Sequence, residues 1–174
     1  MDWFWIVAVV GAVFVIYLMA SKSGRKERPV RRFRQRDTLF TAAERSFLGV
    51  LDQAAEGRYR VFGKVRVADV LTTVKGLDNS ARTTAFNQIS AKHFDFVLCD
   101  PKTLDIKAVI ELNDKSHRGQ RRANRDELLR SACADAGLQL REVPAQRSYS
   151  IKSTRQLLGE LDVELRAETV IVTD

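Results

Sequence analysis

Cysteine is scarce in this sequence of 174 residues. Only Cys99 and Cys133 are cysteines, and neither belongs to a Cys-x-x-Cys pair. Structural zinc sites and disulfide frameworks need several thiols at characteristic spacings. We therefore expect neither a disulfide framework nor a zinc site built from cysteines.

Charge is missing from residues 3–20, which read WFWIVAVVGAVFVIYLMA and also lack proline and amide side chains. A helix of this length spans roughly 27 Å, close to the ~30 Å of bilayer hydrocarbon. Trp3, Trp5 and Tyr17 lie near its ends, where aromatic rings favour the membrane interface. No basic residue precedes the run, which disfavours a cleaved signal peptide. The pattern predicts a transmembrane anchor over residues 1–21.

Acidic residues are rare in the next segment, a predicted linker over residues 22–37. Between Lys22 and Arg36 there are eight basic residues and one acid, Glu27, which gives a net charge of +7. Basic flanks stay on the cytoplasmic side, so we expect a single-pass inner (plasma) membrane protein with its N-terminus outside and its domain in the cytoplasm. The linker would contact anionic lipid headgroups. Because the rest of the chain is nearly neutral, the basic composition does not by itself predict nucleic-acid binding.

About 135 residues follow the linker, enough for one domain, predicted over residues 38–174. Periodicity and turn residues predict helices over 42–56, 82–92, 123–136 and 154–166. They predict strands over 59–71, 94–99, 106–112 and 138–143. This order favours an α/β or α+β domain with a small mixed sheet flanked by helices.

Two acids in the predicted hairpin form a candidate site. Asp95 and Glu111 are equidistant from Thr103 in the turn, so they would lie opposite one another on one face. Opposed Cβ atoms are ~4.5–5.5 Å apart, and two carboxylates placed there could hold one divalent cation. A one-residue bulge would break this arrangement. The other face would be apolar, with Phe94, Phe96, Leu98, Ile110 and Leu112.

Basic residues follow the second strand of this hairpin closely. They are Lys115, His117, Arg118, Arg121, Arg122 and Arg125. This cluster could bind phosphates while the acids bind a metal, as in phosphodiester hydrolysis. It could also be a solvated loop whose arginines neutralise the acids, and composition alone favours that second interpretation.

The segment from His93 to Val143 resembles a bacterial family, domain of unknown function 2726, and the resemblance covers most of residues 38–145. It rests on an Asp-Phe-Val strand, an Ile-Glu-Leu-Asn-Asp strand end, a histidine shortly after, and an Arg-Asp pair opening a helix that ends in Ala-Gly. That family is similar to the restriction-endonuclease-like, PD-(D/E)xK superfamily, near the very-short-patch-repair endonucleases. The resemblance implies a restriction-endonuclease-like fold and Mg²⁺-dependent cleavage of nucleic acid.

The resemblance also implies roles for individual residues. Asp95 and Glu111 match the metal-binding acids, while Asn113 stands where the motif has lysine, and an amide cannot act as a cation or a base. His117 matches the histidine of the repair branch and would act as general base, and Lys115 would supply the missing charge. The remaining residues would support the site or bind nucleic acid: Arg118, Arg121, Arg122, Arg125 and Asp126.

The leading hypothesis is therefore a membrane-anchored, Mg²⁺-dependent nuclease-like domain. A second hypothesis keeps the fold without the chemistry, as a membrane-bound adaptor that binds nucleic acid or a protein, and Asn113 favours it. A third is a purely structural tether, which predicts binding of neither metal nor nucleic acid.

Overall fold

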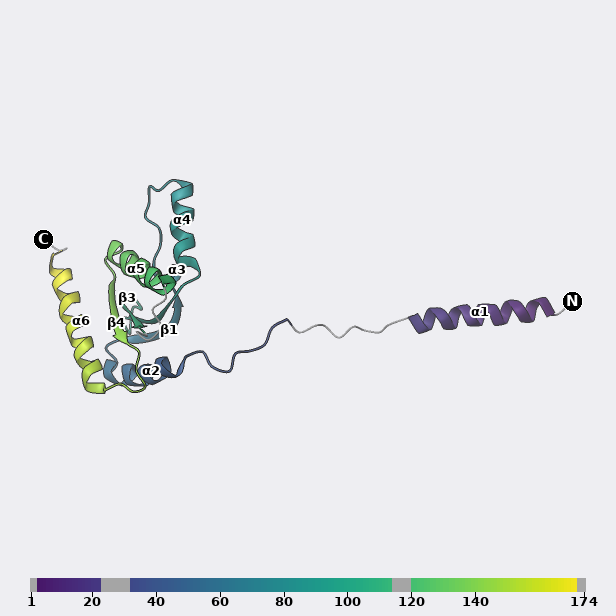
Figure 1. Cartoon of the computed structure of the whole chain (residues 1–174), viewed down its shortest axis with the longest axis horizontal. Coiled ribbons are helices and arrows are strands. Elements are labelled where there is room, and N and C mark those ends of the chain that lie inside the picture. Colours follow the sequence, from purple (N-terminus) through teal and green to yellow (C-terminus); the bar gives the residue numbers. More distant parts are fainter. Residues whose placement is uncertain (1–2, 23–31, 114–119, 172–174) are drawn as a thin grey trace. The chain divides into compact units, whose positions relative to one another are not determined.

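The computed structural model in Figure 1 describes residues 3–22, 32–113 and 120–171. Contacts divide the chain into two compact units, Met1–Asp37 and Thr38–Asp174. The first unit contains helix α1 (Trp3–Lys22), and the second contains the other helices and the sheet. Residues 23–31, which make up most of the predicted basic linker, lie outside the described residues.

Helix α1 does not bear out the predicted membrane anchor. Its side chains are described from Trp3 to Met19, and the large apolar ones among them are exposed. Within residues 3–22, 32–113 and 120–171, no helix is both long enough and apolar enough to cross a membrane. The predicted transmembrane helix over residues 1–21 is therefore corrected, and so is the single-pass inner-membrane location with an outer N-terminus and a cytoplasmic domain.

The second unit is built on one mixed sheet with strand order β1-β2-β3-β4. The strands are β1 (Arg60–Arg66), β2 (His93–Cys99), β3 (Ile106–Asn113) and β4 (Gln139–Pro144). The first three are antiparallel neighbours, and β4 runs parallel to β3. Parallel neighbours need a crossover, which helix α5 (Gln120–Asp135) supplies. The predicted small mixed sheet flanked by helices is confirmed.

The other helices are α2 (Ala42–Ala55), α3 (Val67–Val70), α4 (Asn79–Ser90) and α6 (Ile151–Ile171). Helix α2 begins with the predicted capping box, in which Thr41 and Glu44 accept each other's backbone N–H groups. The predicted strand over 59–71 is too long, because residues after Arg66 form the short helix α3. Helix α4 begins earlier than predicted, since the Asp78 side chain caps it by accepting the Ala81 N–H.

Two hydrophobic cores pack against the sheet, and helices α2 and α5 lie on opposite sides of it (Figure 1). The first lies under α2 and α6 and includes Phe47, Leu51, Phe96, Leu98, Ile110, Leu158 and Leu161. The second lies under α3 and α5 and includes Val67, Phe94, Val97, Val109, Leu129 and Cys133. Neighbouring residues of β2, such as Phe96 and Val97, alternate between the cores, as the period of a strand requires. We call these the α2 face and the α5 face.

Candidate functional site

The side chains of strands β1 and β2 exchange faces of the sheet at one point along the strands. Phe94 packs on the α5 face although Phe96, two residues on, packs on the α2 face. Between the paired residues Gly63↔Phe96 and Val65↔Phe94, Lys64 has a φ of 57°, in the left-handed region. A strand normally keeps alternate residues on one face, and this backbone reversal breaks the alternation without a register shift. The prediction that Phe94 shares the face of Phe96 was wrong for this reason.

Asp95 lies at this reversal and close to Glu111. The register of β2 and β3 ends with Phe96 paired with Ile110, and Asp95 and Glu111 are the next residues of the two strands. The bulge lies at Leu98/Cys99, on the turn side of the acids. Here carboxylates replace ladder partners: the Asp95 N–H donates to Glu111 Oε1 at 3.1 Å, and the Leu112 N–H donates to Asp95 Oδ2 at 2.9 Å. Each acid thus satisfies a backbone amide of the neighbouring strand.

Both acids are nearly inaccessible. Asp95 is 7% exposed and Glu111 is 8% exposed, in a described interior that is otherwise almost entirely apolar. Burying a carboxylate is costly unless it is paired and hydrogen-bonded, so this part of the sheet needs compensating groups. A cation meets Asp95 directly.

That cation is Lys64. Its Nζ lies 2.7 Å from Asp95 Oδ1 and 2.8 Å from Glu44 Oε1. The second oxygen of Glu44 accepts the Thr41 N–H at 2.9 Å, so the capping box of α2 also fixes one partner of the lysine. Burial lowers the pKa of Lys64, but hydrogen bonds to Asp95 and Glu44 outweigh that effect, and the pKa is raised. The ammonium therefore stays charged at neutral pH.

The first turn of α2 is positioned by close packing against β1. An added Cβ at Gly63 would lie 2.3 Å from the Phe40 Cζ atom, so only glycine leaves room for that ring. The Phe40 ring stacks on Phe96, with centroids 5.9 Å apart. This contact brings Thr41 and Glu44 over the strand that carries Lys64.

Tyr149 lies close to the same acid on the α2 face. Its ring packs edge-on against Phe47 with centroids 4.8 Å apart, and its hydroxyl oxygen accepts the Gln146 N–H at 2.8 Å. Burial and the charge of Asp95 raise the pKa of Tyr149 against the opposing effect of the Gln146 hydrogen bond. The phenol therefore stays neutral at the edge of the site.

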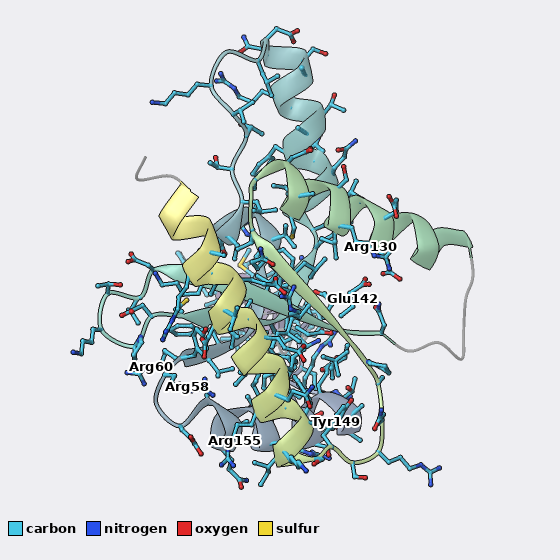
Figure 2. The ribbon with its side chains drawn as sticks, turned by 90° about the vertical axis from the view of Figure 1, so that its left-hand side faces the viewer. Arg58, Arg60, Arg130, Glu142, Tyr149 and Arg155 are labelled. Carbon is cyan, nitrogen blue, oxygen red and sulfur yellow. The ribbon has the colours of Figure 1, made fainter. Side chains whose placement is uncertain are left out.

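Glu111 lies near helix α5. It follows Val109 by two residues, and burial together with the charge of Glu111 raises the pKa of the Cys133 thiol to about 11. In the register of β3 and β4, Glu111 is paired with Glu142. Glu142 forms an ion pair with Arg130 of α5 at 2.8 Å (Figure 2). A shallow hollow of about 460 Å³ lies beside this pair, between α5 and β4, and Cys133 lines it.

The remaining predicted site residues follow β3. Asn113 ends that strand, is half-buried, and its carbonyl accepts the Ala145 N–H at 2.9 Å. Lys115, His117 and Arg118 lie outside the described residues, as do the side chains at the start of α5, namely Arg121, Arg122 and Arg125. Asp126 is half-buried on the same helix.

Sequence reasoning missed Lys64 and Glu44 as members of the site. Lys64 fits the solvent-facing side of an alternating strand, and Glu44 fits a helix cap. Both descriptions are locally correct. The role of Lys64 depends on a positive φ and on a strand 31 residues away, which no local pattern reports.

The donor atoms suit a hard cation. Mg²⁺ prefers oxygen ligands and is often held by one or two carboxylates together with water and substrate phosphates. Asp95 and Glu111 supply that minimum. A larger cage is not seen: in the part of the chain that the structure describes, no group of three or more His, Cys, Asp or Glu residues is arranged to hold a metal.

Comparisons with known proteins identify the family. Neither the curated proteins nor the solved structures contain a match to this chain. The model of a family described as "Protein of unknown function (DUF2726)" matches residues 36–161, which run from the approach to α2 into α6 and include Glu44, Lys64, Asp95 and Glu111. Since this match covers most of the sequence, the chain belongs to the DUF2726 family.

Proposed function

We propose that the unit Thr38–Asp174 is a restriction-endonuclease-like domain that hydrolyses phosphodiester bonds of nucleic acid with Mg²⁺. The observation that carries the proposal is that two nearly buried carboxylates, Asp95 and Glu111, lie close together on neighbouring strands, where the Asp95 N–H donates to Glu111 Oε1. Apolar side chains would often stabilise such positions better than buried charges. Ionisable groups kept in such an environment are characteristic of functional sites.

In this proposal Asp95 and Glu111 hold the metal ion. Bound Mg²⁺ would polarise a phosphoryl oxygen and favour ionisation of the attacking water. His117 would accept the proton of that water, and Lys115 would supply positive charge beside it. Binding of the substrate phosphates is assigned to the basic residues that follow, Arg118, Arg121, Arg122 and Arg125.

The test uses the purified full-length chain on single- and double-stranded DNA and RNA with Mg²⁺ or Mn²⁺. We expect cleavage that Asp95→Asn and Glu111→Gln each reduce at least a hundredfold. Asp52→Asn, an exposed acid of α2, is the matched control and should retain full activity. Equal cleavage by the parent and Glu111→Gln, or cleavage by none of the proteins, would contradict the catalytic proposal.

A second candidate function is binding without hydrolysis, either of nucleic acid or of a protein partner. The ion pair between Lys64 and Asp95 favours it, because a cation of the chain already neutralises one of the two acids. Asn113 in place of a motif lysine favours it as well. This candidate predicts nucleic-acid binding without cleavage and no rise in melting temperature on adding Mg²⁺.

A further inference from the structure

The Lys64 ammonium joins three separate elements of the second unit. It extends from β1 to Glu44 of α2 and to Asp95 of β2, at 2.8 and 2.7 Å. The lysine side chain is 25% exposed, while those of Glu44 and Asp95 are 13% and 10% exposed. The ion pair is thus shielded from water. In such a shielded place opposite charges attract more strongly than at an open surface.

The oxygens of Asp95 are divided between two partners. Oδ2 accepts the Leu112 N–H, which belongs to the pairing of the strands, and Oδ1 accepts the Lys64 ammonium. A metal ion approaching Asp95 without disturbing the sheet would therefore bind Oδ1. There it would meet the ammonium at a few ångströms, and two cations at that separation repel strongly in a partly buried place.

We infer that Lys64 is a built-in counter-cation of Asp95, and that a divalent cation bound by Asp95 displaces it. This inference rests on the proposed function, since it takes Asp95 as a metal ligand. Lys64 would compete with the metal for one oxygen atom, and Glu44 would hold the lysine in place for that competition. The left-handed φ of Lys64, uncommon in a residue with a side chain, shows that the surrounding structure holds this residue in an unusual conformation.

The first measurement is Mn²⁺ affinity by isothermal titration calorimetry on the full-length chain. Lys64→Gln removes the competing charge, so we expect Mn²⁺ to bind at least tenfold more tightly than to the parent. Lys64→Arg keeps the charge and should stay within a few-fold of the parent. Lys75→Gln, at an exposed lysine, is the matched control and should change nothing. Asp95→Asn should abolish binding in either background.

The second measurement needs no variant and so does not depend on how Lys64→Gln folds. An amine-acetylating reagent is applied to the parent chain with and without saturating Mn²⁺, and each lysine is quantified by mass spectrometry. Displacement predicts at least a threefold faster modification of Lys64 with Mn²⁺ and an unchanged rate at Lys75.

The outcomes separate this inference from the proposed function. If Lys64→Gln binds Mn²⁺ no better than the parent, or if neither protein binds it, the inference is overturned. Unchanged modification of Lys64 in a parent chain that does bind Mn²⁺ also overturns it. Tighter binding by Lys64→Gln in a chain that cleaves nothing supports the counter-cation and contradicts hydrolysis. Cleavage by the parent with unchanged metal affinity in Lys64→Gln supports hydrolysis and overturns the counter-cation.

Discussion

The two faces of the sheet handle charge in different ways. On the α2 face, Asp95 and Lys64 form an ion pair whose members are mostly shielded, and each also contacts a second partner. On the α5 face, Arg130 and Glu142 form an ion pair at a similar distance, but their side chains are 45% and 31% exposed. A shielded pair is costly to break because it leaves an uncompensated charge, whereas an exposed pair contributes little. Loss of the ion pair should therefore lower the free energy of unfolding much more on the α2 face than on the α5 face.

The largest effect is expected from Asp95→Ala. The substitution leaves Lys64 with a single acidic partner and the Leu112 N–H without its acceptor. We expect the free energy of unfolding to fall by about 3 kcal/mol, near the lower end of the range for breaking a buried pair, since Lys64 is partly exposed. Urea unfolding followed by circular dichroism measures it. A loss below about 1 kcal/mol would remove the contrast between the faces.

The next effect concerns Cys133 on the α5 face. Its pKa is raised from 9.0 to about 11, so the unfolded chain loses the thiol proton at lower pH than the folded chain. The neutral thiol makes its full contribution to the free energy of unfolding below pH 9, and this contribution is lost as the pH rises through about 11. We expect this to remove about 2 kcal/mol of unfolding free energy. The measurement is urea unfolding at pH 8 and pH 11 for the parent and Cys133→Ala, in which this part of the loss should disappear.

A smaller effect tests how α2 is positioned over the site. In Gly63→Ala the new methyl group would lie 2.3 Å from the Phe40 ring, which must move. Overpacking of this kind costs about 1–2 kcal/mol, and displacement of the first turn of α2 should also weaken the contact of Glu44 with Lys64. Thermal unfolding measures the loss. The matched control is Gly49→Ala, within α2 and with open space around the new methyl, which should stabilise the chain by about 0.5–1 kcal/mol.

These positions also show how far the sequence alone could be interpreted. The four strands, most of the helices after residue 38 and the hairpin that brings Asp95 close to Glu111 follow from periodicity and from one turn, because both signals are local. The Lys64 ion pair depends on a backbone reversal in one strand and on contacts with two distant elements, so it could not be predicted. The anchor was predicted from apolarity and length along the sequence, which the described part of α1 does not bear out.

The smallest effect is expected from Glu142→Ala, and it tests the comparison from the other side. Arg130 keeps a second partner, Glu127, at 3.3 Å, and water solvates its exposed guanidinium, so the remaining charge costs little. We expect a loss of less than about 0.5 kcal/mol, which added salt screens further. Urea unfolding at low and high salt measures it, beside Asp95→Ala. A loss as large as that of Asp95→Ala would mean that the hollow beside Cys133, rather than the reversal at Lys64, is where charge matters most to this fold.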